Sequence, residues 1–374
     1  MRPPHRVLMI AVLSTASCVA LLGFATESQT DQSLPLFGRS SEIIVVDGIP
    51  VPDIGPLPAP VPVPTGNVRH TATIELGRQL FFDGRLSRNN QVSCAYCHIP
   101  GSGFSDPHPT SLGVDDLIGG RQAPTVLNTA FSPLLFWDGR AKSLEEQSLG
   151  PIQNPVEMAE TLDHLVAKLQ TVKGYRQQFR NVFGTEITPQ GISEAIAAFA
   201  RTLISTNSAF DQYSRGNKQA MSEAAMRGMV LFKNKARCIL CHNGPNFTDN
   251  QFHNLGVPQV GPMKIDLGRY EVTGQDRDKS AFKTPTLRSI LETAPYMHDG
   301  VFLRLEEVIE FLDKGGGANP NLSPLMRPLG LTQEEKADLL AFLETLTGAP
   351  LMIEPPQLPH EQEAYMDSPS GARS

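Results

Sequence analysis

The stretches "VSCAYCHIPG" (92–101) and "RCILCHNG" (237–244) decide the fold. Each places two cysteines three residues apart and follows the second directly with a histidine: Cys94, Cys97 and His98 in the first, and Cys238, Cys241 and His242 in the second. The chain has only five cysteines, and these two stretches use four of them. Their chemistry is therefore central to the protein.

Several kinds of site use paired cysteines, and the spacing separates them. A zinc ribbon folds two pairs round one ion, but Cys94 and Cys238 lie 144 residues apart. A thioredoxin-type pair expects a βαβ context, and a disulfide framework does not explain a histidine after each pair. Covalent haem attachment explains both features, because two thiols one helical turn apart meet the haem vinyl groups and the adjacent imidazole ligates the iron. The sequence therefore predicts two haem c groups.

The composition indicates an exported, acidic, globular protein. The 374 residues suffice for two domains, and 40% hydrophobic with 19% charged residues is typical of soluble proteins. Residues 1–25 join two arginines to an apolar run that ends in Gly-Phe-Ala, which predicts a cleaved signal peptide and a periplasmic location. An uncleaved membrane anchor is the alternative interpretation of this segment.

Removal of residues 1–25 leaves 30 basic and 39 acidic residues, a net charge of −9. Such a charge argues against nucleic acid and anionic membranes as partners, so we expect neither nucleic-acid binding nor stable membrane insertion. It suits a basic protein partner.

The chain resembles one unit used twice. Residues 80–106 and 231–249 each contain Leu-Phe, the Cys-x-x-Cys-His motif and then Phe-Ser/Thr-Asp. A helical segment closes each half, and Phe199 and Phe342 in these segments lie 143 residues apart. Because motif and closing helix recur at one spacing, the sequence predicts a duplicated domain. We predict an all-α fold of two cytochrome-c-like helical domains, residues 71–214 and 215–349.

The second closing helix has clear signals at both ends. Thr332 and Glu335 predict a capping box, a leucine stripe predicts one buried face, and Gly348 predicts the end. Outside the two domains, residues 26–70 predict a linker. Its segment 50–64 has seven prolines in fifteen residues, which indicates a stiff spacer outside any core. Residues 350–374 form a C-terminal tail.

At this point the sequence resembles the bacterial di-haem cytochrome c peroxidase and MauG family. The resemblance covers residues from about 72 to 348. It rests on six stretches: "LGRQLFFDGRLS" (76–87), "APTVLNTAFSPLLFWDGRAKSLEEQ" (123–147), "GPIQNPVEM" (150–158), "KTPTLR" (283–288), "APYMHDG" (294–300) and "LEEVIEFLDKGG" (305–316). It implies two cytochrome-c-like domains, each with one haem c, and an interdomain calcium ion.

The resemblance also assigns roles to individual residues. The N-terminal haem would bind hydrogen peroxide, with Gln147 and Glu157 beside it, and the glutamate would move the proton between the peroxide oxygens. From the residues alone, the favoured interpretation of Glu157 is a helix-starting acid, with Asn154 as N-cap and Pro155 at the first helical position; the resemblance reverses this preference. Trp137 would relay electrons between the haems, whereas a lone tryptophan is ordinarily a core residue.

The calcium ligands of the family are matched by Gln122, Thr293 and the Pro295 carbonyl. Gln122 stands where the family usually has asparagine. The resemblance thus implies Ca²⁺ between the two halves, with a glutamine oxygen in place of the asparagine oxygen.

Three departures from the family pattern modify these expectations. Many members block the peroxide haem with a histidine at the position of Val114, so here that haem should be open in the oxidised protein. His108 lies nearby between two prolines, and we expect it to face solvent.

The second departure is at the far ligand of the second haem, where Leu312 stands at the family's ligand position. Either another residue ligates the iron, with Met263, Met297, Met326 and His253 as unranked candidates, or this haem has no far ligand from the protein. The MauG tryptophan before the second motif is matched by Ala236.

The sequence as a whole therefore predicts a periplasmic di-haem peroxidase of the MauG-like branch. It would reduce hydrogen peroxide with electrons that enter through the second haem from a small cytochrome c, a cupredoxin or another exported protein. The alternatives are peroxide-dependent modification of a protein substrate and a plain di-haem electron-transfer cytochrome.

Overall fold

The computed structural model describes residues 42–65, 70–351 and 353–360. The expected signal peptide lies outside these residues. The helices are α1 (Thr71–Phe82), α2 (Cys94–Cys97), α3 (Leu144–Gln153), α4 (Leu162–Gln170), α5 (Lys173–Phe183), α6 (Pro189–Ala200), α7 (Ala209–Ser214), α8 (Glu223–Lys233), α9 (Tyr270–Thr273), α10 (Leu305–Asp313) and α11 (Gln333–Glu344). The strands are β1 (Ile43–Val46), β2 (Ile49–Pro52), β3 (Phe252–His253) and β4 (Phe282–Lys283).

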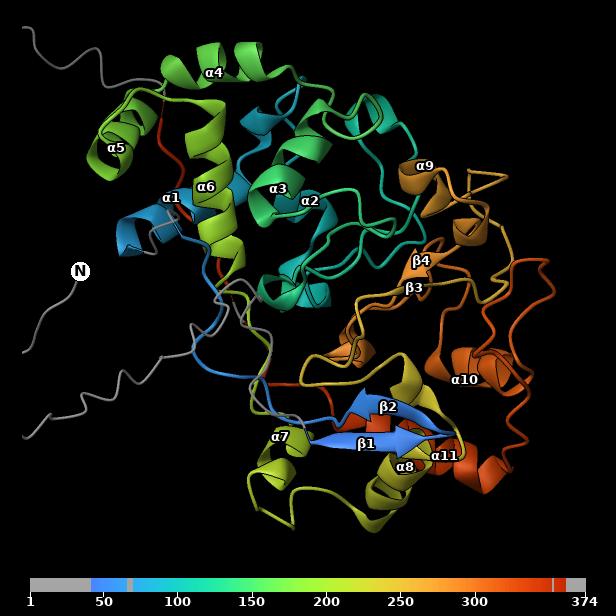
Figure 1. Cartoon of the computed structure of the whole chain (residues 1–374). Helices are drawn as coiled ribbons and strands as arrows, with labels where there is room; N and C mark the ends of the chain where they lie inside the picture. The colour runs from blue at the N-terminus through green and yellow to red at the C-terminus, as the bar shows by residue number, and fades with distance from the viewer. Residues whose placement is uncertain (1–41, 66–69, 352, 361–374) are drawn as a thin grey trace, which may run out of the picture. The chain divides into compact units, whose positions relative to one another are not determined.

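The described elements are mostly helical, as predicted, but they include two small antiparallel sheets (Figure 1). In the first sheet Ile43 pairs with Pro52, and in the second Phe252 pairs with Lys283. The all-α expectation therefore needs this correction. Among the described residues no helix is long and apolar enough to cross a membrane.

Two large apolar clusters correspond to the two sequence halves. The first is built from residues between Leu76 and Leu203, and the second from residues between Phe210 and Leu346 with Val46 and Val51 added. In the first cluster α1 packs against α6, and in the second α8 packs against α11. In each half, the helix that precedes the Cys-x-x-Cys-His motif therefore packs against the closing helix.

Glycines at equivalent positions let these helices cross closely. A Cβ atom on Gly77 would lie 1.8 Å from the Ala195 carbonyl oxygen, and one on Gly228 would lie 1.9 Å from the Asp338 carbonyl oxygen. Both distances are far below van der Waals contact. The same close approach in both halves supports the duplication that the sequence predicts.

A phenylalanine trio also recurs in the two halves. The rings of Phe81 and Phe199 lie 5.2 Å apart in the first cluster. The rings of Phe232 and Phe342 lie 5.2 Å apart in the second. A third ring joins each pair from the segment after the motif, Phe104 at 6.4 Å from Phe81 and Phe247 at 6.0 Å from Phe232. These tilted and edge-on ring contacts pack the segment after each motif against the pair α1–α6 or α8–α11.

The helix predicted at the end of the second half is present as α11. Thr332 Oγ1 accepts from the Glu335 backbone nitrogen at 3.2 Å, and the Glu335 carboxylate accepts from the Thr332 nitrogen at 2.8 Å. The capping box is therefore confirmed. The helix ends at Glu344, four residues before Gly348, because the chain tightens into a turn at Thr345.

The prediction that the linker before residue 71 lies outside any core is wrong for the hairpin β1–β2. Val46 and Val51, on β1 and β2, are buried in the second apolar cluster. Asp53 pairs with Lys233 of α8 at 2.7 Å, and the Gly55 carbonyl accepts from Arg288 at 2.9 Å. The alternating valines bury one face of the hairpin, so this arm is part of the second core.

The start of the C-terminal tail packs on the other half. Leu351 and Ile353 contact the first apolar cluster. The Glu354 carbonyl accepts from Arg78 of α1 at 3.0 Å. The arm before the first half thus joins the second core, and the segment after the second half joins the first core.

Candidate functional site

Each Cys-x-x-Cys-His motif lines a cavity. The first cavity has a volume of about 490 Å³ and the second about 230 Å³. The first is lined by Cys94, Cys97 and His98, and the second by Cys238, Cys241 and His242. The structure therefore brings together each set of residues that the sequence assigned to a haem.

The two histidines are held in the same way. His98 Nδ1 lies 3.2 Å from the Phe104 carbonyl oxygen, and His242 Nδ1 lies 3.0 Å from the Phe247 carbonyl oxygen. A carbonyl only accepts, so Nδ1 carries the proton and Nε2 is free to ligate a metal. Burial lowers the pKa of both imidazoles, which favours the neutral form that ligates iron.

The cysteines fit thioether attachment as well. Burial raises the pKa of Cys94 and of Cys238 to about 12. These thiols lie inside apolar cavities next to a neutral imidazole, which is the donor set of a c-type haem. The residues present therefore fit one haem c in each cavity.

The first cavity also contains the predicted acid–base pair. Gln147 on α3 and Glu157 in the turn after α3 both line it. Glu157 Oε1 accepts from Asn154 Nδ2 at 2.5 Å. Burial raises the pKa of Glu157, although the charge of Arg140 and the Asn154 hydrogen bond oppose this shift. The result is a carboxyl that holds its proton more readily than an exposed glutamate.

The helix-start interpretation of Glu157 is wrong. Asn154 is the residue after the end of α3, and residues 155–158 form turns. The Asn154 carbonyl accepts from the Glu157 nitrogen at 3.1 Å, which closes a turn in place of starting a helix. Glu157 caps nothing and faces the cavity.

Neither Val114 nor His108 reaches the first cavity. The Val114 side chain is fully buried in the first apolar cluster, and its backbone nitrogen donates to the Glu157 carbonyl at 2.8 Å. The His108 side chain is 74% exposed and pairs with Asp106 at 2.8 Å. The expectation that His108 faces solvent is confirmed.

Trp137 lies between the two cavities. It lines both of them, together with Gln122, Pro124 and Thr125. Its Nε1 donates to the Gln122 carbonyl at 2.9 Å, and its own carbonyl accepts from the Lys283 nitrogen of β4 at 2.8 Å. The first half thus fixes the indole and the second half fixes the Trp137 backbone, and Trp137 lines both cavities.

The three residues matched to calcium ligands all line the second cavity. Gln122 donates through Nε2 to the Asp106 carbonyl at 3.1 Å, and its backbone nitrogen donates to the His298 carbonyl at 2.8 Å. Thr293 and Pro295 follow the short 3₁₀ helix Ile290–Glu292. The available donors are an amide oxygen and backbone carbonyls, which suit a hard cation.

The second cavity has a different wall. Its α10 begins with Leu-Glu-Glu, as α3 does, and Glu146 and Glu307 each accept from a backbone nitrogen four residues earlier. In this alignment Val308 replaces Gln147. Leu312 lies one turn further along α10 and also lines the cavity. The acid–base pair of the first cavity has no counterpart on this helix.

The four candidates for the far ligand of the second haem do not all line the second cavity. His253, Met297 and Met326 line the second cavity, whereas Met263 lines the first. Met263 is therefore excluded for the second haem. Ala236 also lines the second cavity and is buried.

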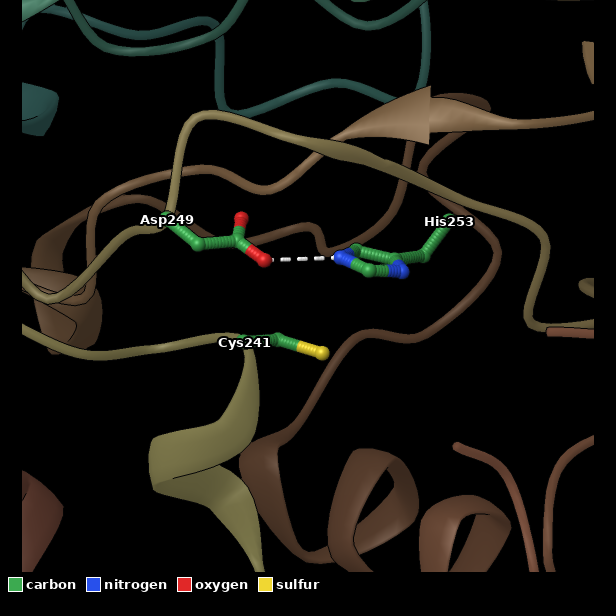
Figure 2. A group of neighbouring side chains, drawn as sticks. All are labelled: Cys241, Asp249 and His253. Atoms are coloured by element: carbon green, nitrogen blue, oxygen red, sulfur yellow. Dashed lines mark hydrogen bonds and ion pairs between the residues drawn. The ribbon is translucent and has the colours of Figure 1, made fainter. Parts of the chain in front are cut away.

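Asp249 is a site residue that the sequence reasoning missed. Its Oδ2 lies 2.8 Å from His253 Nε2, and the two side chains point toward one another with the Cys241 sulfur beside them (Figure 2). These three residues could hold a metal ion, but Cys241 belongs to the second motif, so the group is part of the same site. The repeated Phe-Ser/Thr-Asp was the available signal, since Asp106 of the first copy also pairs with a histidine, His108, although through Nδ1 and at the surface.

Charged residues join the two halves beside the cavities. Arg121 binds Asp266 at 2.7 Å and Asp138 at 2.6 Å. These two carboxylates raise the pKa of Arg121 and keep it charged. Arg269 donates to the Asp138 carbonyl at 2.8 Å. Residues from both halves therefore fix the segment that carries Trp137.

Comparison with known proteins agrees with this arrangement. Residues 71–219 match the family described as di-haem cytochrome c peroxidase. The methylamine utilization protein MauG of Methylorubrum extorquens is 42% identical over 81% of this chain and 86% of its own length. The cytochrome c551 peroxidase of Nitrosomonas europaea is 40% identical over 73% of this chain and 79% of its own. The crystal structure of a MauG-like protein associated with microbial copper homeostasis matches with a TM-score of 0.71 and 34% identity, over 78% of this chain and 95% of that one.

Proposed function

The chain belongs to the di-haem cytochrome c peroxidase family and is a di-haem peroxidase, and from this premise we propose an exported enzyme of the MauG-like branch. It would act in the periplasm, as the segment 1–25 suggests. Two cytochrome-c-like domains, residues 71–214 and 215–349, would each hold one haem through its Cys-x-x-Cys-His motif. The two separate apolar clusters support a division into two halves, although Phe210, which precedes residue 215, belongs to the second cluster.

One observation carries the assignment of roles to the two cavities. Gln147 and Glu157 line the first cavity, while Val308 and Leu312 occupy the comparable helix of the second. Peroxide reduction needs a group that moves a proton between the two oxygens, and Glu157 can do so, whereas the described α10 side chains that line the second cavity, Leu305, Val308 and Leu312, cannot. We therefore assign peroxide to the first cavity and electron transfer to the second.

The residues of the first cavity would act in sequence on the substrate. When bound, the haem supplies the iron that receives peroxide oxygen and the electrons that reduce it. Glu157 Oε2 would take the proton of the near oxygen and return it to the leaving oxygen, while Asn154 holds Oε1. Gln147 would orient the peroxide through its side-chain amide. Val114 offers no lone pair, so the cavity would accept peroxide in the oxidised protein.

Trp137 is the proposed path for electrons between the cavities. Trp137 lines both cavities, Gln122 holds its indole nitrogen, and Lys283 holds its backbone carbonyl. An external donor such as a small cytochrome c or a cupredoxin would reduce the second haem. The acidic net charge of −9 after loss of residues 1–25 suits a basic donor.

Calcium binding is proposed at Gln122, Thr293 and Pro295. Calcium takes six to eight oxygen ligands, so water would complete the site. The supporting observation is that all three residues line the second cavity. Removal of calcium with a chelator should then perturb the second haem before the first.

Steady-state turnover tests the function directly. The holoprotein should oxidise many equivalents of a reduced small cytochrome c for each protein molecule when peroxide is present. A single defined mass change on a partner protein, without such turnover, would instead favour peroxide-dependent protein modification. Absence of any reaction with peroxide would favour a plain electron-transfer cytochrome and overturn the proposal.

A further inference from the structure

We distinguish two sides of the second cavity, and His242 identifies the first of them. His242 Nδ1 faces the Phe247 carbonyl, and Pro285 lines the same cavity. In the first cavity His98 Nδ1 faces the Phe104 carbonyl, and Pro124 lines that cavity. The imidazole side is therefore built by the motif and by the segment after it that supplies this carbonyl.

The other wall comes from α10 and the segment that follows it. In the first cavity the corresponding helix α3 and the turn after it supply Gln147 and Glu157. By the same correspondence, α10 and residues 314–331 should face the side of the second haem away from His242. Five apolar side chains of these segments line the cavity: Leu305, Val308, Leu312, Leu325 and Leu329.

Two other side chains of these segments reach the cavity, Met326 and Arg327. The Arg327 guanidinium is paired with Asp47 at 2.7 Å, and a guanidinium has no lone pair for a metal. The Met326 thioether is a soft donor that haem iron accepts. Met326 is thus the one residue of this wall, among the described residues, that could ligate iron.

The backbone around Met326 is anchored to the second motif. The Leu325 carbonyl accepts from Arg237, the residue before Cys238, at 2.7 Å. The Leu329 nitrogen donates to the Asp313 carbonyl at the end of α10 at 2.9 Å. Such fixed points on both sides hold a ligand at a constant distance from the metal.

Gly316 leaves room for the Met326 side chain. A Cβ atom on Gly316 would lie 3.1 Å from Met326 Cε and 2.4 Å from the Leu255 carbonyl oxygen. Its φ of +81° also favours glycine. The methyl end of Met326 therefore rests on a glycine backbone inside the cavity wall.

Other donors in the cavity are less suitable. His253 has Nε2 at 2.8 Å from Asp249 and Nδ1 at 3.5 Å from Ser323, and it lies beside Cys241 (Figure 2). It therefore sits at the edge where the haem is attached. The His298 ring stacks on Phe282 with 3.6 Å between centroids and an interplanar angle of 13°. Met297 occurs in the turn before α10, outside the wall that the duplication indicates.

We propose that the Met326 thioether is the sixth ligand of the iron in the second cavity, on the side away from His242. The inference rests on the haem content of the proposed function, but not on peroxidase activity. Methionine–histidine ligation raises the reduction potential of a haem, which suits the site that receives electrons. Met326 would also supply the ligand that Leu312, which has no lone pair, cannot supply.

Spectroscopy of the full holoprotein tests this assignment. The oxidised wild-type protein should show the near-infrared charge-transfer band of methionine-ligated ferric haem, and Met326→Leu should abolish it and lower the potential of the second haem. Carbon monoxide binding by the fully reduced protein should about double in Met326→Leu, because both haems would then be open. Leucine is close to methionine in volume, so folding should be preserved.

Met297→Leu is the matched control, because it removes a second thioether from the same cavity. It should leave the band and the carbon monoxide stoichiometry unchanged. Met326→His should restore a six-coordinate, low-spin second haem without the methionine band. The assignment is overturned if the wild-type protein with two bound haems lacks the band, if Met326→Leu keeps it, or if Met297→Leu removes it. Haem content and peroxide turnover are measured separately, so a wrong ligand assignment can be told apart from a wrong proposed function.

Discussion

Replacing Glu157 by glutamine removes the proposed proton carrier from the first cavity with little change in shape. The amide oxygen of glutamine can still accept the hydrogen bond that Asn154 Nδ2 now donates to Oε1 at 2.5 Å. Positioned proton transfer contributes about 10²- to 10⁴-fold to a rate. At about 1.4 kcal/mol for each factor of ten, the variant should lose roughly 3 to 5 kcal/mol of transition-state stabilisation.

The assay is peroxide-dependent oxidation of a reduced small cytochrome c, with activity expressed per bound haem. Glu146→Gln is the matched control, since Glu146 is an exposed acid on the neighbouring helix α3 whose backbone contact an amide oxygen can keep. It should keep the wild-type rate. A Glu157→Gln variant that carries both haems and loses less than about tenfold in rate would refute proton transfer by Glu157.

The pH dependence gives a second check on the same residue. Burial raises the pKa of Glu157, and the positive charge of Arg140 opposes the shift. Because the carboxylate form takes the first proton, kcat/KM should fall as pH falls through this raised pKa. Arg140→Met removes the opposing charge and should move this acid limb to higher pH. The limb should be absent in Glu157→Gln, and an unchanged limb there would assign it to another group.

Three further predictions concern electron transfer and stability. Trp137→Phe should slow the peroxide-driven oxidation of the second haem in single-turnover stopped-flow experiments while leaving both haem spectra intact; an unchanged rate would remove the relay role. Gly228→Ala should lower the free energy of unfolding by about 3 kcal/mol or more in urea titrations, because its Cβ would press on a carbonyl of α11, whereas Gly55→Ala meets no atom within 4 Å and should have little effect. Arg288→Met should cost about 3 to 5 kcal/mol, because it leaves the fully buried Asp211 carboxylate without its partner at 3.1 Å; a loss below about 1 kcal/mol would show that the pair is not needed.

The sequence was sufficient for features that repeat or that act over short distances. The two Cys-x-x-Cys-His motifs predicted two equivalent sites, and each set lines one cavity. The capping box of Thr332 and Glu335 is local, so it could be identified from four consecutive residues. Asn154 shows the limit of such local signals, because asparagine followed by proline is compatible with both the start and the end of a helix. Here it follows the end of α3.

Features that depend on distant contacts were not predictable from one sequence. The hairpin β1–β2 is short and lies beside a proline-rich segment, and its packing on the second core determines its place. The position of Trp137 between the cavities depends on a bond to Lys283, far along the chain. Likewise, the candidates for the second haem could be ranked only after Met263 was found in the first cavity and Met326 in the second.

Rapid mixing of the fully oxidised holoprotein with hydrogen peroxide tests most directly whether the first haem is open. Val114 lies in the apolar core and His108 pairs with Asp106 at the surface, so neither supplies a ligand to the first haem. We expect an immediate spectral change of a high-spin first haem, without prior reduction. If both haems are low-spin at rest and nothing reacts until one electron is added, the first cavity is blocked and an open peroxide site is excluded.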